Sequence, residues 1–230
     1  MADHSFVAPF RAGTPQSRQR DGIGRAAGDF PPAQAAMNGL HELLAAATKL
    51  QTFLLDKGWR FCFIGGIAVQ RWGNPRFTQD IDLTLMTGFG DEERFVDILL
   101  EGLEIRRPDA RAFALQNRVL LAQTREGVDV DVALGALPFE DRSVSRATPW
   151  KGDGFELTTC SAEDLIVHKA FAGRERDWDD LESVLVRQHQ RLDLTQIRSE
   201  LAPLLELKGE VEALDKLERI TQRVRGRLNR

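Results

Sequence analysis

Residues 63–86 read FIGGIAVQRWGNPRFTQDIDLTLM, and this stretch decides how the rest of the chain is interpreted. The apolar run at residues 60–64 predicts a buried strand, which two glycines end. Residues 67–72 indicate a short helix that stops at a Gly-Asn-Pro turn. Residues 78–86 then alternate, which predicts a strand with two different faces. One face carries Ile81, Leu83 and Leu85, and the other carries Asp80, Asp82 and Thr84.

Further elements are predicted on both sides of this stretch. Upstream, leucines and alanines at spacings of three and four after Pro32 predict a helix that ends at Lys57-Gly58. Downstream, residues 91–103 indicate a helix, and residues 118–123 and 128–134 indicate two strands around a turn. The last strand alternates again and places Asp129 and Asp131 on one face. The sequence therefore predicts a mixed α/β unit.

The second half of the chain has a different character. Two short strands are expected within residues 145–159, and helices near 161–172, 176–190, 194–206 and 209–226. We therefore expect a disordered tail at 1–32, an α/β core at 33–144 and a mainly helical region at 145–230.

Composition narrows the function classes. The 230 residues carry a net charge of −4, so no overall basic field draws the chain to nucleic acid or membrane. A basic C-terminal end could bind RNA phosphates or simply complement a helix dipole. Two cysteines are too few for a disulfide-stapled domain. With no apolar signal core and no run of eighteen apolar residues, we expect a cytoplasmic protein that does not bind membranes.

Three features predict chemistry on triphosphates. Asp80 and Asp82, at positions i and i+2 of a strand, project the same way and can hold Mg²⁺ ions, which prefer oxygen ligands. A third acid from the strand at 128–134 can bind a metal and orient or deprotonate an attacking hydroxyl. Gly65 and Gly66 let backbone N–H groups approach phosphates, where a Cβ would collide. Two metal ions side by side would serve nucleotidyl transfer.

These residues resemble the DNA polymerase β-type nucleotidyltransferase superfamily. Its signature is a strand, Gly-Gly or Gly-Ser, a helix and then Asp-x-Asp between apolar residues. Here thirteen residues separate Gly65-Gly66 from Asp80-Ile81-Asp82. The runs IGGIAVQRWGNPRFTQDIDLTL, VDVDVALGALPFE and AEDLIVHKAFAGRERDWDDL are similar to the AbiEii/AbiGii-type toxin branch. The resemblance covers roughly residues 60–185 and implies an α+β fold, a small mixed sheet flanked by helices and followed by a helical C-terminal part.

The resemblance also implies roles for single residues. Asp80, Asp82 and Asp131 would be catalytic metal ligands, with Asp129 the alternative third carboxylate on the same strand face. Gly65 and Gly66 would bind the substrate, and Lys169 would contact the triphosphate. Asp177 or Asp180 would support the site or the acceptor, and Arg174 is a further candidate. His168, next to the lysine, is interpreted as a structural or exposed residue.

The expected function is a metal-dependent transfer of an NMP from an NTP to an acceptor hydroxyl. In the toxin branch the acceptors include tRNA ends, and related folds modify proteins, so the acceptor is RNA or protein and a cognate antitoxin is an expected partner. The alternative is a binding module, an inactive nucleotidyltransferase fold that acts as an antitoxin or a partner-binding subunit. The residues do not choose the nucleotide, the acceptor or the oligomeric state.

Overall fold

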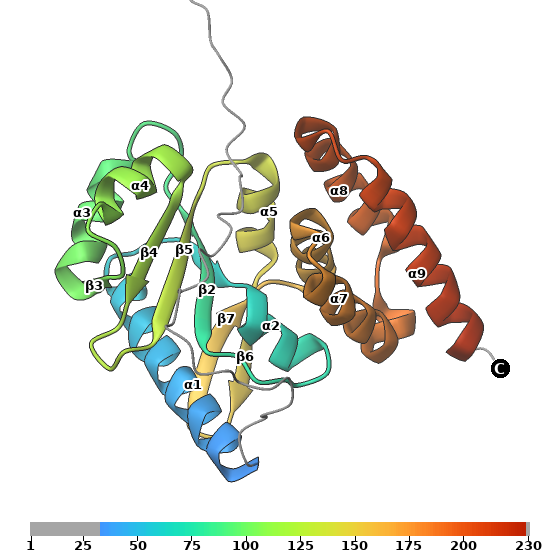
Figure 1. Ribbon diagram of the computed structural model, residues 1–230, viewed down its shortest axis with the longest axis horizontal. Helices are drawn as coiled ribbons and strands as arrows, with labels where there is room; N and C mark the ends of the chain where they lie inside the picture. Colours follow the sequence, from blue (N-terminus) through green and yellow to red (C-terminus); the bar gives the residue numbers. More distant parts are fainter. Residues whose placement is uncertain (1–32, 229–230) are drawn as a thin grey trace, which may run out of the picture.

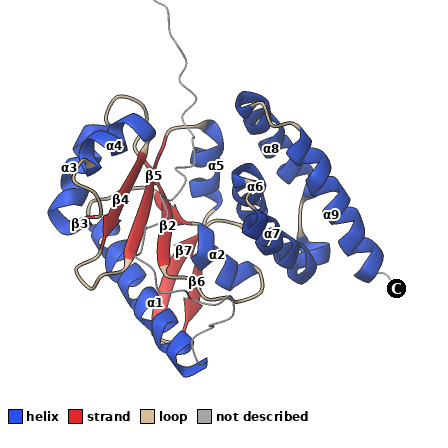
Figure 2. Cartoon of the chain, viewed as in Figure 1, coloured by secondary structure: helices blue, strands red, loops and turns tan. Residues whose placement is uncertain are grey.

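The computed structural model describes the backbone of residues 33–228 and the side chains of residues 38–228. Within this part the strands form one seven-stranded sheet in the order β3-β4-β5-β2-β1-β7-β6 (Figures 1 and 2). The strands are β1 (Phe61–Phe63), β2 (Asp80–Met86), β3 (Glu104–Ile105), β4 (Val119–Gln123), β5 (Asp129–Gly135), β6 (Thr148–Gly152) and β7 (Phe155–Thr159). The sheet is mixed: β2 is parallel to β5 and β1 is parallel to β7, whereas the other pairs are antiparallel.

One face of the sheet is covered by helices α1 (Ala33–Asp56), α3 (Glu92–Gly102) and α4 (Ala110–Asn117). The alternation of β2 determines which side chains face them. Ile81, Leu83 and Leu85 have no exposed surface and pack with the leucine stripe of α1. The face predicted to be apolar is therefore the buried one, and the acids of β2 lie on the opposite face.

The opposite face is covered by α2 (Gly65–Trp72), α5 (Pro138–Arg146) and α6 (Ala162–Ala172). Helices α7 (Glu175–Gln188), α8 (Leu194–Lys208) and α9 (Glu212–Leu228) pack outward from α6, with a short 3-10 turn, η1 (His189–Arg191), before α8. In Figure 1 these helices gather on the side of the sheet away from α3 and α4. A second apolar core joins them to α2.

Local signals explain where α6 begins and ends. The Asp164 backbone N–H donates a 3.1 Å hydrogen bond to Ser161 Oγ, which is the N-cap predicted from the sequence. Gly173 ends the helix at φ +70°, a left-handed conformation that glycine adopts without steric cost. This sharp stop turns the chain directly into α7.

Most predicted elements are confirmed, and three were missed. The short strands expected within 145–159 are β6 and β7, and β7 pairs with β1, so the sheet continues past residue 144. The sequence reasoning placed nothing at β3, α4 or α5. The tail expected at residues 1–32 lies outside the described residues. None of the described helices is long and apolar enough to cross a membrane.

Candidate active site

The acids of two neighbouring strands lie side by side. Strands β2 and β5 run parallel and in register, so Asp80 is opposite Asp129 and Asp82 is opposite Asp131. Paired strands are about 4.8 Å apart, and in-register side chains point to the same face. The structure therefore brings together the acids that the sequence singled out, with Asp131 next to Asp82.

Gly65 and Gly66 pack against the start of this strand pair. A Cβ on Gly65, which has φ +56°, would lie 2.0 Å from Asp82 Oδ2. A Cβ on Gly66 would lie 2.2 Å from Thr78 Oγ1. The Gly66 backbone N–H also donates a long, 3.4 Å hydrogen bond to Asp82 Oδ2. Gly65 is therefore required by the close approach of β2, and Gly66 by that of Thr78 just before β2, in addition to the phosphate contacts expected from the sequence.

The environment of these acids disfavours their charged forms. Burial is the largest cause for each, and it raises the pKa of Asp80, Asp82 and Asp131 above the ordinary value. Neighbouring carboxylates act in the same direction, and the pKa of Asp131 rises to about 6. Clustered acids with raised pKa values are typical of functional sites that bind a cation or move a proton.

Arg106, which follows β3, binds two of the acids. Its Nη1 lies 2.8 Å from Asp129 Oδ2, and its Nη2 donates to Asp131 Oδ1. The guanidinium lowers the pKa of Asp131, in opposition to burial. Arg106 thus compensates the charge of Asp129 and Asp131 in this structure, a role that the sequence reasoning did not foresee.

A second charged cluster lies where α6 meets α7. Lys169 is buried, and its Nζ lies 2.8 Å from Asp177 Oδ1 and 2.8 Å from Asp180 Oδ2. Arg76, from the loop before β2, donates to both oxygens of Asp180, from Nε to Oδ1 at 2.5 Å and from Nη2 to Oδ2 at 2.7 Å. Burial raises the pKa of Asp180, but the hydrogen bonds with Arg76 and Lys169 outweigh it and hold the pKa below the ordinary value.

One acid of the first cluster and part of the second cluster face one cavity of about 180 Å³. Asp82 and Gly65 line it from the sheet side, and Lys169, Asp177 and Arg174 line it from the helical side. Lys169 also lowers the pKa of Asp82, against the larger effect of burial. The arrangement therefore brings Asp82 of β2 and Lys169 of α6 to a common space.

The acids of β2 and β5 have the donor chemistry that Mg²⁺ prefers, since all of them are carboxylates. Within the described residues, no three Asp, Glu, His or Cys side chains are yet arranged as a cage around one ion. Arg106 forms ion pairs with Asp129 and Asp131 in this structure. A magnesium site on these acids would require Asp131 to leave that guanidinium.

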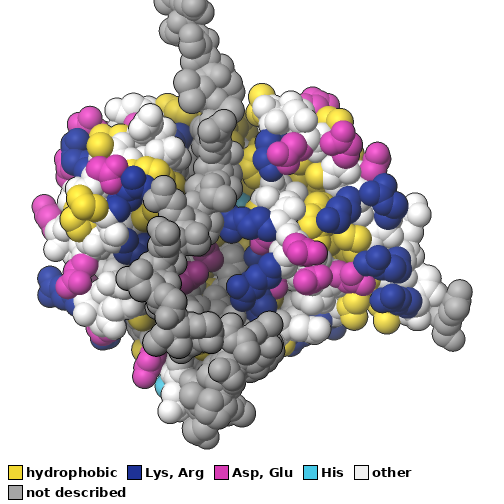
Figure 3. Space-filling view, in the orientation of Figure 1, with side chains coloured by type: hydrophobic (Ala, Val, Ile, Leu, Met, Phe, Trp, Pro, Cys, Tyr) yellow, Lys and Arg dark blue, Asp and Glu magenta, His cyan; other side chains and the backbone are white. Residues whose placement is uncertain are grey.

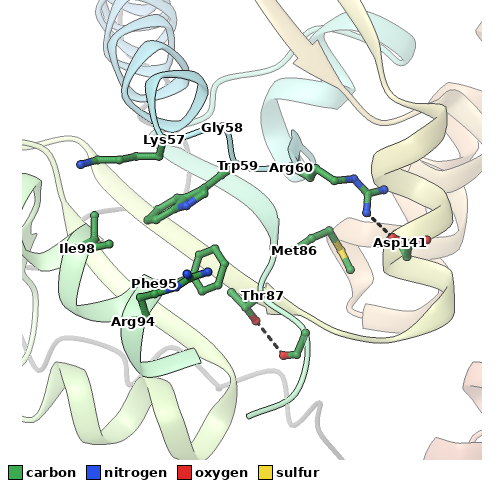
Figure 4. Close-up of a pocket in the computed structure, with 11 residues that line it drawn as sticks. Lys57, Gly58, Trp59, Arg60, Met86, Thr87, Arg94, Phe95, Ile98 and Asp141 are labelled. Carbon is green, nitrogen blue, oxygen red and sulfur yellow. Dashed lines mark hydrogen bonds and ion pairs between the residues drawn. The ribbon is translucent and has the colours of Figure 1, made fainter. Parts of the chain in front are cut away.

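A larger cavity of about 720 Å³ lies at the other end of β2 (Figure 4). Trp59, Arg94 and Met86 line it, and Arg60 forms a 2.7 Å ion pair with Asp141 at its edge. It contains none of the site residues predicted from the sequence. We therefore place the chemistry at the smaller cavity, which Asp82 and Lys169 line.

Four polar residues near the site escaped the sequence reasoning. Arg76 and Arg106 reach their partners across 104 and 25 residues, and no local pattern signals such contacts. Thr84 was assigned to the polar face of its strand but given no role. The interpretation of His168 as structural or exposed was incomplete, because its Nε2 is buried without a hydrogen-bond partner beside the cavity.

Comparison with known proteins adds a family match. A family model described as "Nucleotidyl transferase AbiEii toxin, Type IV TA system" matches residues 50–229. The match includes every residue discussed above for the site. A search of curated proteins finds no significant match.

Solved structures with a similar arrangement are distant in sequence. An antigenic nucleotidyltransferase-like protein from Paracoccidioides brasiliensis is 17% identical, with 75% of this chain and 93% of that chain covered and a TM-score of 0.46. A putative nucleotidyltransferase from H. pylori is 15% identical, with 86% and 98% covered and a TM-score of 0.45. The antibiotic-resistance factor ANT(2'')-Ia is 14% identical, with 80% and 98% covered and a TM-score of 0.46.

Proposed function

The chain belongs to the AbiEii nucleotidyl transferase toxin family, and from this premise we propose that it transfers an NMP from an NTP to an acceptor hydroxyl. The observation that carries the proposal is the register of β2 and β5. It sets Asp82 beside Asp131, next to Gly65 and across a cavity from Lys169. Such a set of residues suits a reaction whose main demands are positioning and charge neutralisation.

The reaction follows from the chemistry of the groups. The acceptor oxygen attacks the α-phosphorus of the NTP, the bond from that phosphorus to the bridging oxygen breaks, and pyrophosphate leaves with the electron pair. Asp80, Asp82 and Asp131 would hold Mg²⁺, which supplies charge neutralisation of the phosphate oxygens and activation of the hydroxyl. We expect two ions, as in other two-metal sites.

The chain's own residues supply the remaining functions. Asp131 would orient the attacking hydroxyl or take its proton. Asp129 is the alternative for this role. Lys169 would contact the triphosphate, with Asp177 and Asp180 holding its ammonium in place. Arg174, exposed at the rim of the cavity, would add positive charge for the NTP.

The acceptor that we favour is RNA, including tRNA ends. Helix α9 exposes Arg219 and Arg225, and also Arg223, which forms an ion pair with Glu182. In Figure 3, Lys and Arg side chains lie among Asp and Glu side chains over this helical part. Arginines bind nucleic-acid phosphates without regard to sequence. A protein hydroxyl is the second acceptor class. Because the family is described as a type IV toxin–antitoxin system, we also propose a cognate antitoxin as partner.

The test is incubation of the purified protein with each α-³²P-labelled NTP, Mg²⁺, and total bacterial RNA and protein. The Asp80→Ala, Asp82→Ala double variant serves as control. Label on an RNA or protein band with the wild type alone would support the proposal and name nucleotide and acceptor. No label with any NTP, together with no thermal shift by NTP and Mg²⁺, would favour an inactive binding module instead.

A further inference from the structure

The cavity beside Asp82 and Lys169 has lining residues that the proposed reaction does not use. Most of them are apolar, with Leu137 and Phe139 from the α5 region, Phe171 from α6 and Leu204 from α8, and the buried carboxylate of Glu140 lies among them. Its volume of about 180 Å³ is below the roughly 300–1,000 Å³ of small-molecule pockets. It therefore has room for only a part of an NTP, and an apolar lining does not suit the triphosphate.

Two residues that line this same cavity each carry a buried polar atom without a hydrogen-bond partner. Thr84 Oγ1 and His168 Nε2 are buried and have no hydrogen-bond partner within the described residues. The great majority of buried polar atoms in proteins are hydrogen-bonded. Leaving one unpaired costs about 1–3 kcal/mol. Two such atoms on one cavity indicate that a polar ligand group completes them.

The chemistry of His168 suits a planar heterocycle. Burial lowers the pKa of His168 to about 4, so its ring is neutral at pH 7 and its Nε2 can donate or accept according to tautomer. The Phe139 ring lies 5.0 Å from the His168 ring, centroid to centroid, at an interplanar angle of 60°. Thr84 can likewise donate or accept. An aromatic wall beside two adaptable polar groups fits the edge and face of a nucleobase.

We propose that this cavity binds the nucleobase of the NTP, with His168 Nε2 and Thr84 Oγ1 reading its polar edge and Phe139 forming its apolar wall. The inference rests on the proposed function, because the triphosphate at Asp82 and Lys169 is what brings the base here. His168 and Thr84 are then specificity residues: they select among nucleotides and take no part in the phosphorus chemistry. A site that hydrogen-bonds its ligand rejects analogues that leave its polar groups unpaired.

The experiment compares binding of ATP, GTP, CTP, UTP and inorganic tripolyphosphate to the full chain, with Mg²⁺, by calorimetry. The variants are His168→Gln and Thr84→Val, with Thr84→Ser as the conservative rescue. We expect the two variants to bind the preferred NTP about tenfold more weakly, which corresponds to the loss of one hydrogen bond. The differences in affinity among the four NTPs should become smaller. Tripolyphosphate binding should stay unchanged, and Thr84→Ser should restore the ranking.

A matched control is His189→Gln. His189 Nε2 is also buried without a partner, but it lies at the end of α7 and does not line the cavity. Its loss should leave the ranking intact. If His168→Gln and Thr84→Val both keep the wild-type ranking, the base assignment is wrong. Should His168→Gln fail to fold, the Thr84 pair alone decides the outcome.

The two proposals fail in different ways. If the wild type transfers label but its base ranking ignores Thr84 and His168, only the base assignment falls. If the wild type binds tripolyphosphate and every NTP equally, the base is not read and the assignment also falls. If it binds no NTP and transfers nothing, the proposed function falls and the base assignment with it.

Discussion

Replacing Gly65 with alanine tests why a glycine stands at the first position of α2. The new Cβ would meet Asp82 Oδ2 at 2.0 Å, Cγ at 2.5 Å and Cβ at 2.7 Å, so the Asp82 side chain must move. Alanine at φ +56° also carries a left-handed penalty. The penalty is about 1–2 kcal/mol and overpacking adds about 1–3 kcal/mol, so we expect a loss of about 2–5 kcal/mol in the free energy of unfolding.

Gly209→Ala separates the two effects. Gly209 has φ +73° and nothing within 4 Å of an added Cβ, so its variant should lose only the left-handed penalty of about 1–2 kcal/mol. Urea unfolding of both variants gives the comparison. In an Asp82→Gly background the three contact atoms are absent, and Gly65→Ala should then cost no more than Gly209→Ala. Equal stability of the two alanine variants in the wild-type background would refute the steric conflict with Asp82.

Three further predictions concern charged groups. Arg106→Ala should raise Mg²⁺ affinity about tenfold by freeing Asp131, which matches the ~1.5 kcal/mol of a hydrogen bond to a charged group; Mg²⁺-dependent thermal shifts measure it, and Arg107→Ala, on the surface, should change nothing. The pKa of His168 falls from 6.5 to about 4 on folding. The wild type should therefore lose up to about 3 kcal/mol of stability between pH 6.5 and pH 4, whereas above pH 6.5 the effect is absent. Urea unfolding measures the free energy of unfolding of the wild type and His168→Gln at each pH. Equal pH dependence of the two proteins would contradict the prediction. Lys169→Met should lower the free energy of unfolding, measured with urea, by about 3 kcal/mol, because two buried carboxylates lose a compensating positive charge. A loss below about 1 kcal/mol would mean that the ion pairs of Lys169 contribute no more than surface salt bridges do.

Local patterns predicted the part of the site that lies on single strands. The alternation of β2 and β5 assigns each acid to a face, because side chains of a strand point to opposite sides in turn. Lys169 and Asp177, which the family resemblance suggested, form an ion pair, and only the tight turn at Gly173 separates their helices. The facing of the strand acids is visible in sequence because it depends on spacing within one element.

Contacts made by distant segments could not be predicted in this way. Arg106 reaches Asp131 because β3 pairs with β4 at the sheet edge, and β3 has only two residues. Helix α5 begins at Pro138, a residue suited to the first turn, but its nine residues are too few for a clear helical period. His168 Nε2 lacks a hydrogen-bond partner because of the groups that surround it in the fold. Those surroundings come from distant elements such as α5 and β2, so local sequence patterns do not reveal them.

Transfer of the α-phosphoryl group with its nucleoside tests most directly whether Asp82 and Asp131 serve nucleotidyl transfer. The wild type, Asp82→Asn and Asp131→Asn are each incubated with Mg²⁺, the extract and the preferred NTP, labelled either at the α- or at the γ-phosphorus. We expect label on the acceptor from the α-position only, with pyrophosphate released, and a loss of at least about a hundredfold in both variants, as for removal of a key charge-stabilising group. Label arriving from the γ-position, or equal transfer by Asp82→Asn and the wild type, would contradict the assignment of these acids to nucleotidyl transfer.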